Sequence, residues 1–330
     1  MTDHVRIGIL GAARIAPAAV VRPARSSATV EVAAVAARDA GRARKFADRH
    51  VVAKVHDSYE ALLDDPNIDA VYIPLPNGLH GRWTSRALAA GKHVLCEKPF
   101  AANADEAAEV AEVANASGLV VMEAFHYRYH PLVARMVEVV GELGPLRHVD
   151  ARMSFPLPRF GDIRYSLGLA GGALMDAGCY PVNLVRLLGG GEPEVRSARA
   201  LLKGEGVDRA MRAGLLFPAG HTGTVVTSMW SRSLLKLSAR VIGERGEMRV
   251  LNPFMPQLGH RLTVKLEGQR RVERFDRRPS YAYQLDAFAD AILHGTPFPT
   301  TADDAVAGMR VIDAIYLAAG LGVRRPSNSA

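Results

Sequence analysis

Two short stretches carry side chains whose types and spacing suit proton transfer. In the first, Lys98 follows an apolar run, His93–Cys96, and stands directly before Pro99. A lysine at the carboxyl end of a buried strand lies where open α/β sheets bind their ligands, although a solvated turn would give the same pattern. In the second, Asp176 and Tyr180 are four residues apart, so on a helix they share one face. An ammonium group, a phenol and a carboxylate together could move a proton to or from a bound molecule.

The surrounding pattern indicates the elements that would position these side chains. In the first third of the chain, fully apolar runs alternate with helix-patterned segments. The runs are Val5–Leu10, Val30–Ala36, Ala70–Ile73, His93–Cys96 and Leu119–Met122. Apolar strands separated by helices predict a parallel sheet covered on both faces. We therefore predict an α/β domain over residues 1–125.

The rest of the chain, residues 126–330, has longer strands with alternating polarity. They are Arg147–Phe155, Val195–Leu202, Ala210–Phe217, Gly223–Met229, Lys236–Ile242, Glu247–Leu251, Arg261–Leu266 and Arg271–Phe275. Such strands predict a large, mostly antiparallel open sheet. Helical patterns return at Tyr281–His294 and Thr301–Ala319, so this part is expected to be a second domain of the α+β class.

The first strand–helix turn suits a dinucleotide. Gly11, Ala13 and Ala16 occupy the three fixed positions of the G-x-G-x-x-G/A fingerprint. Ala13 replaces the second glycine, and its methyl group leaves less room for the pyrophosphate to approach the backbone. The turn follows the first strand and opens a helix, whose N-terminus can hold a phosphate. We therefore predict a Rossmann domain with Gly11, Ala13, Arg14 and Ile15 at the cofactor; a purely structural turn is the alternative.

The end of the second strand indicates which dinucleotide would bind. An acidic residue about 20 positions after the glycines would bind the ribose 2′-hydroxyl of NAD, but this chain has Ala36-Ala37-Arg38 there. Arg38 can meet a 2′-phosphate with a planar fork of donors, and Arg42, one helical turn later, could assist. An exposed arginine at a helix start is the alternative for Arg38. The missing acid favours NADP over NAD.

The composition indicates which classes of binding partner are expected. The chain has 330 residues, of which 48% are apolar and 23% charged, and a formal net charge of +7. Its arginines are scattered singly, without a basic run, which argues against nucleic acid and favours anionic small molecules. No apolar run approaches the roughly 18 residues of a membrane span, so no membrane partner is expected. With only two cysteines, no disulfide framework is predicted and a cytoplasmic location fits.

Five motifs together resemble one family. They are GILGAARIA at 8–16, VAAVAARD at 32–39, PLPNGLH at 74–80, AGKHVLCEKP at 90–99 and GGALMDAGCYPVN at 171–183. By these motifs the chain is identified as a member of the glucose–fructose oxidoreductase/inositol dehydrogenase (Gfo/Idh/MocA) family. It is most similar to the branch of dimeric dihydrodiol dehydrogenases, NADP-dependent D-xylose dehydrogenases and sugar ketoreductases. Inositol dehydrogenases usually have histidine where this chain has Tyr180, which disfavours inositol as the substrate.

The resemblance implies an activity and an assembly. In this family the second domain binds the substrate and often forms the subunit interface, so a homodimer or homotetramer is expected. The expected activity is hydride transfer between NADP and a carbohydrate-like alcohol or carbonyl, with an aldopyranose ranked before a keto-sugar. A non-catalytic NADP-sensing regulator on the same fold is the alternative. Such a regulator would be free to lose Lys98, Asp176 and Tyr180, yet all three are present.

The proton-transfer site is predicted to combine these three residues. Tyr180 would be the general acid/base, Lys98 its electrostatic partner and Asp176 the carboxylate that orients them. An ammonium group stabilises a neighbouring phenolate, so each group improves the other. Which of the two carries the proton stays open, because coupled groups titrate as a pair. The resemblance also implies a cis Lys98–Pro99 peptide bond.

The resemblance places further residues around this centre. Those expected at the cofactor are Pro76, Asn77, His80 and Glu97 together with Lys98, although a polar surface loop would also explain Asn77 and His80. Arg128 is expected at the substrate, with hinge packing as the alternative. Arg164 stands just before the glycine pair at 171–172 and is expected, from that position, to contact the substrate or a phosphate. His126 and His130 are four residues apart but lack nearby acidic ligands, so no metal site is predicted.

Overall fold

The structure is a computed structural model that describes residues 4–232 and 234–327. Contacts divide the chain into two units. Of the described residues, the first unit comprises 4–126, 281–306 and 326–327, and the second comprises 127–280 and 307–325. The chain therefore leaves the first unit near the predicted boundary but returns to it later. A single division at residue 125 is too simple, and the assignment of functional domains stays a prediction.

Contacts of Tyr281–Val306 explain the return. The ring centroids of His126 and Tyr281 lie 3.9 Å apart. The main-chain N–H of Glu123 donates to the carbonyl oxygen of Thr300 at 2.9 Å. The sequence analysis placed this segment in the second domain. An amphipathic helix can bury its apolar face against any apolar surface, so the sequence pattern could not show that the segment packs with the first unit.

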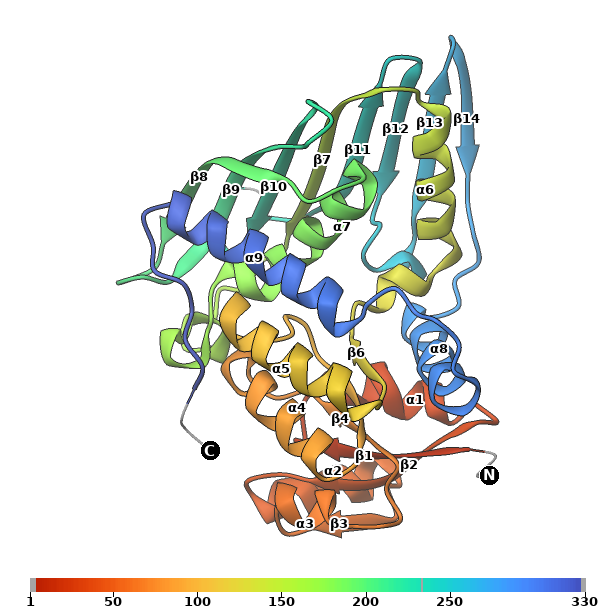
Figure 1. Ribbon diagram of the computed structural model, residues 1–330, viewed down its shortest axis with the longest axis vertical. Helices are drawn as coiled ribbons and strands as arrows, with labels where there is room; N and C mark the ends of the chain where they lie inside the picture. Colours follow the sequence, from red (N-terminus) through yellow and green to blue (C-terminus); the bar gives the residue numbers. More distant parts are fainter. Residues whose placement is uncertain (1–3, 233, 328–330) are drawn as a thin grey trace. The chain divides into compact units, whose positions relative to one another are not determined.

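A six-stranded parallel sheet forms the core of the first unit (Figure 1), in the order β3-β2-β1-β4-β5-β6. The strands are β1 (Val5–Leu10), β2 (Val30–Ala36), β3 (Lys54–His56), β4 (Ala70–Ile73), β5 (His93–Cys96) and β6 (Val121–Glu123). The strand order reverses between β1 and β4. Open α/β sheets bind ligands at the carboxyl ends of the strands beside such a reversal.

The first unit contains short and long helices, and a side chain caps some of them. They are η1 (Pro17–Val21, a π-helix), α1 (Arg22–Ala24), α2 (Ala40–His50), α3 (Tyr59–Leu63), η2 (Asn77–Leu79), α4 (His80–Ala89), α5 (Ala104–Ser117) and most of α8 (Ser280–His294). Asp39, Ser58 and Asn103 accept hydrogen bonds from main-chain N–H groups in the first turns of α2, α3 and α5. These bonds satisfy N–H groups that have no partner inside the helix.

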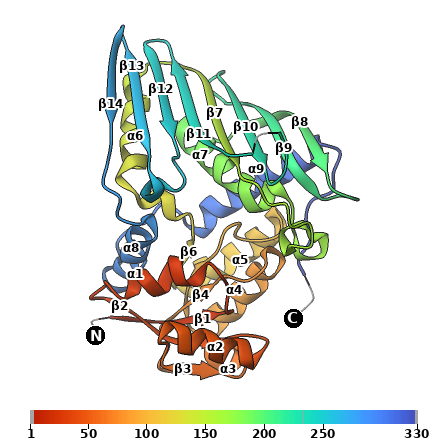
Figure 2. The same ribbon diagram turned by 180° about the vertical axis from the view of Figure 1, so that it is seen from behind.

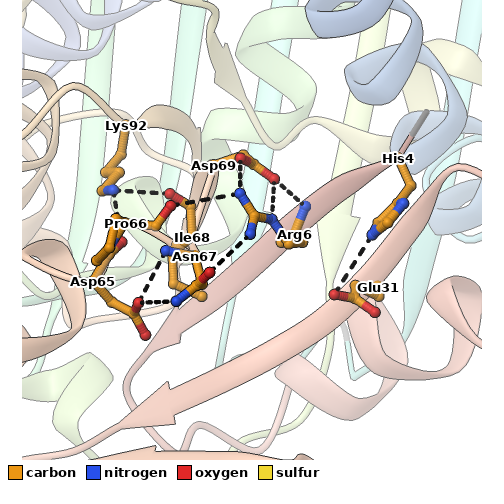
Figure 3. Close-up of polar contacts among 9 residues, drawn as sticks. All are labelled: His4, Arg6, Glu31, Asp65, Pro66, Asn67, Ile68, Asp69 and Lys92. Carbon is orange, nitrogen blue, oxygen red and sulfur yellow. Dashed lines mark hydrogen bonds and ion pairs between the residues drawn. The ribbon is translucent and has the colours of Figure 1, made fainter. Parts of the chain in front are cut away.

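A polar cluster lies at the amino ends of β1 and β4 (Figure 3). Arg6 donates from its main-chain N and Nε to Asp69 Oδ2 at 2.8 and 2.9 Å, and from Nη2 to Asp69 Oδ1 at 2.7 Å. Lys92 Nζ donates to the carbonyl oxygens of Asp65 and Ile68, both at 2.8 Å. This edge is opposite to the carboxyl ends, so the cluster secures the loop before β4 and plays a structural part.

An eight-stranded sheet forms the second unit, in the order β14-β13-β12-β11-β7-β10-β9-β8. The strands are β7 (Leu146–Ser154), β8 (Glu194–Leu202), β9 (Asp208–Leu216), β10 (Thr222–Ser228), β11 (Lys236–Gly243), β12 (Gly246–Leu251), β13 (Arg261–Leu266) and β14 (Gln269–Glu273). Within this second sheet, β7 and β10 pair in parallel, and the other described strand pairs are antiparallel. The predicted fold class is confirmed, and all eight predicted strands form.

Helices of the second unit cover one face of this sheet. They are η3 (His126–Tyr129), α6 (Pro131–Glu142), η4 (Ile163–Tyr165), η5 (Leu167–Leu169), η6 (Leu174–Gly178), α7 (Cys179–Gly189), η7 (Pro256–Leu258) and part of α9 (Ala302–Ala318). α7 packs on β7 and β10, and α6 on β12 and β13. Comparison of Figures 1 and 2 shows no helix of the described unit on the opposite face. That face is called the open face below.

The two faces of the sheet differ in chemistry. Val149, Ala151 and Val241 are fully buried and face the helices. Asp150 and Arg152, the alternate residues of β7, lie on the open face, where Arg152 Nε donates to Asp150 Oδ1 at 2.8 Å. Alternation of this kind is what a sheet with one packed face requires.

Candidate active site

The turn after β1 has the backbone that the sequence predicted for dinucleotide binding. Gly11 has φ +117°, a conformation that favours glycine. Its N–H donates to the carbonyl oxygen of Ala36 at 2.8 Å, and the N–H of Ala13 donates to the oxygen of Gly11, also at 2.8 Å. The turn leads into η1 and α1, with Arg14 exposed and Ile15 half-buried. It therefore offers main-chain groups at the carboxyl end of β1.

Two arginines lie beside this turn. Arg38 is exposed and follows β2, whose last residue, Ala36, pairs with Leu10 at the end of β1. Arg42 Nη2 lies 3.5 Å from the carbonyl oxygen of Ala12. Asp39 accepts a hydrogen bond from the Arg42 N–H at 2.7 Å, and so it caps α2. The carboxyl edge of β1 and β2 thus carries two guanidinium groups near the glycine turn.

The loop after β4 contains Pro76 and Asn77, both half-buried. His80, at the start of α4, is buried: its Nδ1 lies 2.6 Å from the carbonyl oxygen of Pro99 and its Nε2 lies 2.7 Å from that of Leu75. Burial lowers the pKa of His80 to about 4. The imidazole joins the loop after β4 to the turn after β5, and its predicted contact with the cofactor stays a prediction.

The turn after β5 holds Lys98 half-buried. The Lys98–Pro99 peptide bond is cis, as expected. Glu97 is buried and its Oε1 accepts a hydrogen bond from the Tyr72 hydroxyl at 2.7 Å. On the other side of the turn, the N–H of Phe100 donates to a carboxylate oxygen of Glu123 at 3.0 Å. Carboxylates from β6 and from the turn itself therefore fix the backbone that presents Lys98.

The charge of Lys98 affects the buried histidines of its unit. Burial, with a smaller contribution from the positive charge of Lys98, lowers the pKa of His126 to about 3. Burial also raises the pKa of Tyr281, whose ring lies against His126.

Within residues 4–232 and 234–327 no group of three His, Cys, Asp or Glu side chains could hold a metal ion.

Asp176 and Tyr180 belong to the second unit. Asp176 lies in η6, a π-helical turn, and Tyr180 is the second residue of α7. A π-turn is wider than an α-turn and often occurs at functional sites. Arg164 Nε donates to Asp176 Oδ1 at 3.0 Å, and Arg164 Nη1 donates to Asp162 Oδ1 at 3.2 Å. Arg164 therefore orients the Asp176 carboxylate.

Aromatic rings surround Tyr180, which is 6% exposed. Its ring centroid lies 5.8 Å from that of Tyr127 and 5.7 Å from that of Phe254. The Tyr127 hydroxyl donates to Asn183 Oδ1 at 2.6 Å, and Arg128 Nη1 donates to the same oxygen at 3.3 Å. Arg128 is thereby tied to the helix that carries Tyr180.

Sequence reasoning did not identify every member of these arrangements. Asn183 lies in one of the quoted motifs, three residues after Tyr180, and that helical spacing was the available signal. Phe254 and Asp162 lie in loops with no such pattern. Lys98 belongs to the first unit and Asp176 and Tyr180 to the second, so their joint action forms part of the proposal below.

A parallel sheet with a glycine turn after β1 and a lysine after β5, followed by a unit built on a mixed open sheet, defines a dinucleotide-dependent oxidoreductase. The chain belongs to the Gfo/Idh/MocA oxidoreductase family. Residues 5–125 match the family described as "Oxidoreductase family, NAD-binding Rossmann fold", and residues 133–249 match the GFO/IDH/MocA C-terminal domain. The resemblance drawn from the five motifs is confirmed.

Known relatives cover most of the chain. It is 40% identical over 317 residues to D-xylose 1-dehydrogenase (NADP(+)) 2 of Haloferax volcanii, covering 96% of this chain and 97% of that protein. It is 37% identical over 229 residues to the trans-1,2-dihydrobenzene-1,2-diol dehydrogenase of Sus scrofa, covering 68% and 67%. A crystal structure of KijD10, a 3-ketoreductase from Actinomadura kijaniata in complex with NADP and TDP-benzene, has a TM-score of 0.88 at 28% identity, covering 96% and 98%.

Proposed function

We propose that the protein is an NADP-dependent oxidoreductase that transfers a hydride between the nicotinamide and a carbohydrate-like alcohol or carbonyl, an aldopyranose or a keto-sugar. The observation that carries the proposal is the arrangement of Asp176, held by Arg164 at 3.0 Å, one turn before the buried phenol of Tyr180. The relatives named above, a xylose dehydrogenase, a diol dehydrogenase and a ketoreductase, act on hydroxyl or carbonyl groups and so support this class.

The first unit fits NADP better than NAD. Two guanidinium groups, those of Arg38 and Arg42, lie near the Gly11 turn, and Arg42 Nη2 lies 3.5 Å from the Ala12 oxygen. No carboxylate stands at residues 36–38 to bind a ribose 2′-hydroxyl or repel a 2′-phosphate. Bound NADP would supply the nicotinamide that gives or accepts the hydride. Arg14, Ile15, Pro76, Asn77 and Glu97 are proposed to line the same cofactor site.

The chain's own residues would move the proton. Tyr180 is proposed to give a proton to the substrate oxygen or take one from it, and Lys98 to stabilise the phenolate and the developing charge. Asp176 would hold the substrate hydroxyl or the tyrosine in place, since Arg164 orients its carboxylate. Arg128 and Arg164 are proposed to contact the substrate with their remaining donors.

A non-catalytic NADP-sensing regulator is the weaker alternative. The relatives reported above are enzymes, and this chain keeps Lys98, Asp176 and Tyr180. A turnover assay decides between the two functions. Reduction of NADP with D-xylose, D-glucose and a trans-diol, and oxidation of NADPH with keto-sugars, should show turnover with at least one substrate. Tight NADPH binding without turnover across this panel would favour the regulator.

We infer that two chains associate through the open face. This face carries ion pairs rather than a continuous apolar surface: Arg152 pairs with Asp150, and Arg240 and Arg249 both pair with Glu247. Exposed apolar side chains lie among them, including Leu251 at 55%. A second copy would cover both kinds of group. In native mass spectrometry the expected mass is about twice 35.5 kDa, and a tetramer would be about four times that mass.

A substitution at the centre of the open face tests this assembly. Val226 lies opposite Arg152 on β7 and Arg212 on β9. Val226→Lys adds a third like charge there and should shift the mass to the monomer. The matched control is Val113→Lys, at an exposed position on α5 of the first unit. An assembly that survives Val226→Lys would place the interface elsewhere.

Two features bear on where the protein is located in the cell: its helices and its cysteines. No helix in the described part of the chain is long and apolar enough to cross a membrane. Cys96 and Cys179 are both buried and form no disulfide with each other, which suits a reducing compartment. The cytoplasmic location stays a prediction.

A further inference from the structure

A buried ion pair lies in the second unit, outside the proposed catalytic residues. Arg324 Nη2 donates to Asp208 Oδ1 at 2.8 Å, and the two side chains are 2% and 0% exposed. Asp208 begins β9, whereas Arg324 follows α9 near the end of the chain. Burying two charges costs free energy that their attraction often fails to repay. A pair in this position therefore suggests a role in fixing geometry.

Both side chains of the pair also hydrogen-bond to one turn, Gly171–Leu174. Arg324 Nε donates to the carbonyl oxygen of Gly171 at 2.8 Å. Asp208 Oδ2 accepts a hydrogen bond from the N–H of Leu174 at 2.7 Å. The turn is thus held at both ends by two side chains that come from distant parts of the sequence.

At Gly172 the backbone of the turn lies so close to the pair that there is no room for a side chain. Gly172 has φ +140°, and a Cβ atom there would lie 2.1 Å from Asp208 Oδ1 and 2.8 Å from Arg324 Nη2. The Tyr316 hydroxyl donates to Asp208 Oδ1 at 3.0 Å, and the Arg324 guanidinium lies 4.0 Å from the Tyr316 ring centroid. These contacts leave the turn little freedom to shift.

The turn sets the position of Asp176. The N–H of Asp176 donates to the carbonyl oxygen of Gly172 at 3.0 Å. The N–H of Gly172 donates to the carbonyl oxygen of Arg164 at 2.8 Å, and the guanidinium of the same arginine donates to Asp176 Oδ1. A movement of the turn would therefore displace both the Asp176 backbone and the arginine that orients its carboxylate.

We propose that Asp208 and Arg324 are positioning residues, which fix the Gly171–Leu174 turn and through it Asp176 and Tyr180. The inference rests on the proposed function of those two residues. Because Asp208 and Arg324 are buried, they act through the turn and have no contact with the substrate. A displacement of about 1 Å at reacting groups can cost roughly 100-fold in rate, so the pair should affect turnover as well as stability.

Arg324→Lys tests the proposal. Lysine keeps the charge but lacks the planar fork, so it cannot place two separate nitrogens against Gly171 and Asp208 as Arg324 does through Nε and Nη2. We expect kcat to fall about 10- to 100-fold, with the NADPH Kd within about threefold because the proposed cofactor residues belong to the first unit. The matched control is Arg186→Lys. Arg186 is buried and pairs with Glu192 through Nε and Nη2, both at 2.7 Å, near the far end of α7. It should lower Tm with little change in kcat.

A double-mutant cycle separates positioning from a purely structural role. If Arg324 acts through Asp176, the variant with both Arg324→Lys and Asp176→Asn should be no slower, within about threefold, than Asp176→Asn alone. Independent losses that multiply would overturn the proposal. So would a normal kcat in Arg324→Lys with a lowered Tm.

A milder variant covers the case in which Arg324→Lys folds poorly. Tyr316→Phe removes one donor to Asp208 Oδ1, and it should reduce kcat severalfold with the same lack of additivity toward Asp176→Asn. Turnover at the normal rate in this folded variant would also overturn the proposal. If Asp176→Asn and Tyr180→Phe themselves turn over normally, the proposed function fails. If those two are slow while the Arg324 and Tyr316 variants are normal, only the positioning inference fails.

Discussion

The imidazole Nδ1 of His80 lies 2.6 Å from the carbonyl oxygen of Pro99, the residue that follows Lys98. Its Nε2 lies 2.7 Å from the carbonyl oxygen of Leu75. Two carbonyl oxygens favour the imidazolium form, because a neutral imidazole has only one N–H. Burial opposes it and prevails, so the pKa of His80 is lowered to about 4. The neutral ring joins the loop after β4 to the turn that presents Lys98.

Acid should destabilise the protein through its buried histidines. Burial lowers the pKa of His80 to about 4 and that of His126 to about 3. In the unfolded chain a histidine binds a proton near pH 6.5. The unfolded state therefore holds more protons below that pH, and the free energy of unfolding should fall as pH decreases from 6.5 toward 4.

Urea denaturation between pH 7 and 4.5 measures this effect. One such histidine contributes a slope of up to about 1.4 kcal/mol per pH unit. His126→Gln should flatten the dependence, since glutamine does not titrate. A variant whose pH dependence equals that of the wild type would show that His126 is not the group responsible.

Arg38→Ala should weaken NADPH binding by roughly 10- to 150-fold, because hydrogen bonds to charged groups are worth about 1.5–3 kcal/mol. NADH binding should barely change, since NADH has no 2′-phosphate. The matched control is Arg44→Ala, an exposed arginine on α2. Fluorescence titration with both cofactors gives the result, and equal NADH and NADPH affinities in the wild type would contradict the assignment.

Ala37→Asp should reverse the cofactor preference. A carboxylate at the end of β2 can accept hydrogen bonds from a ribose 2′-hydroxyl and repels a 2′-phosphate. Ala37 is 5% exposed, so the ratio of the two Kd values is compared in the folded fraction, judged by an unchanged circular dichroism spectrum. A ratio that does not move toward NADH would argue against the ribose site at residues 36–38.

Tyr180→Phe and Lys98→Met should each reduce turnover by about 10²–10⁴-fold while NADPH binding changes only severalfold. The double variant should be little slower than the slower single one, because the pair acts as a unit. Lys54→Met is the matched lysine control. Lys54 begins β3 and its Nζ pairs with Asp65, and it is not among the residues proposed to bind or to react. Near-normal turnover in Tyr180→Phe would remove the tyrosine from the mechanism.

Gly172→Ala should destabilise the second unit. Its φ of +140° disfavours a side chain, and the new Cβ would lie 2.1 Å from Asp208 Oδ1. A loss of about 2–4 kcal/mol in the free energy of unfolding is expected. Gly141→Ala is the control: Gly141 lies in α6 with open space around it, and alanine there should stabilise by up to about 1 kcal/mol. Thermal denaturation of both variants compares them directly.

Much of the fold followed from local sequence patterns. The strand pattern predicted the two sheets because burial on both faces, or on one, leaves a distinct periodicity. Gly11 marked the turn after β1, the missing acid at residues 36–38 indicated NADP, and Lys98 followed an apolar strand. Two details differ: β3 was not predicted, because its three residues, Lys54–His56, are exposed or half-buried, and β6 begins at Val121 rather than Leu119.

Other features were decided only by tertiary structure. The contact of Tyr281 with His126, and of Arg324 with Asp208, joins residues that are far apart in the chain. The side chain of His80 could have faced solvent, and the spacing of Asp176 and Tyr180 predicted a helix but not that Asp176 lies in a π-helical turn. Periodicity reports which face of an element is buried, but not which distant element covers it. Pairings of this kind depend on the packing of the whole unit, where long-range burial outweighs local preference.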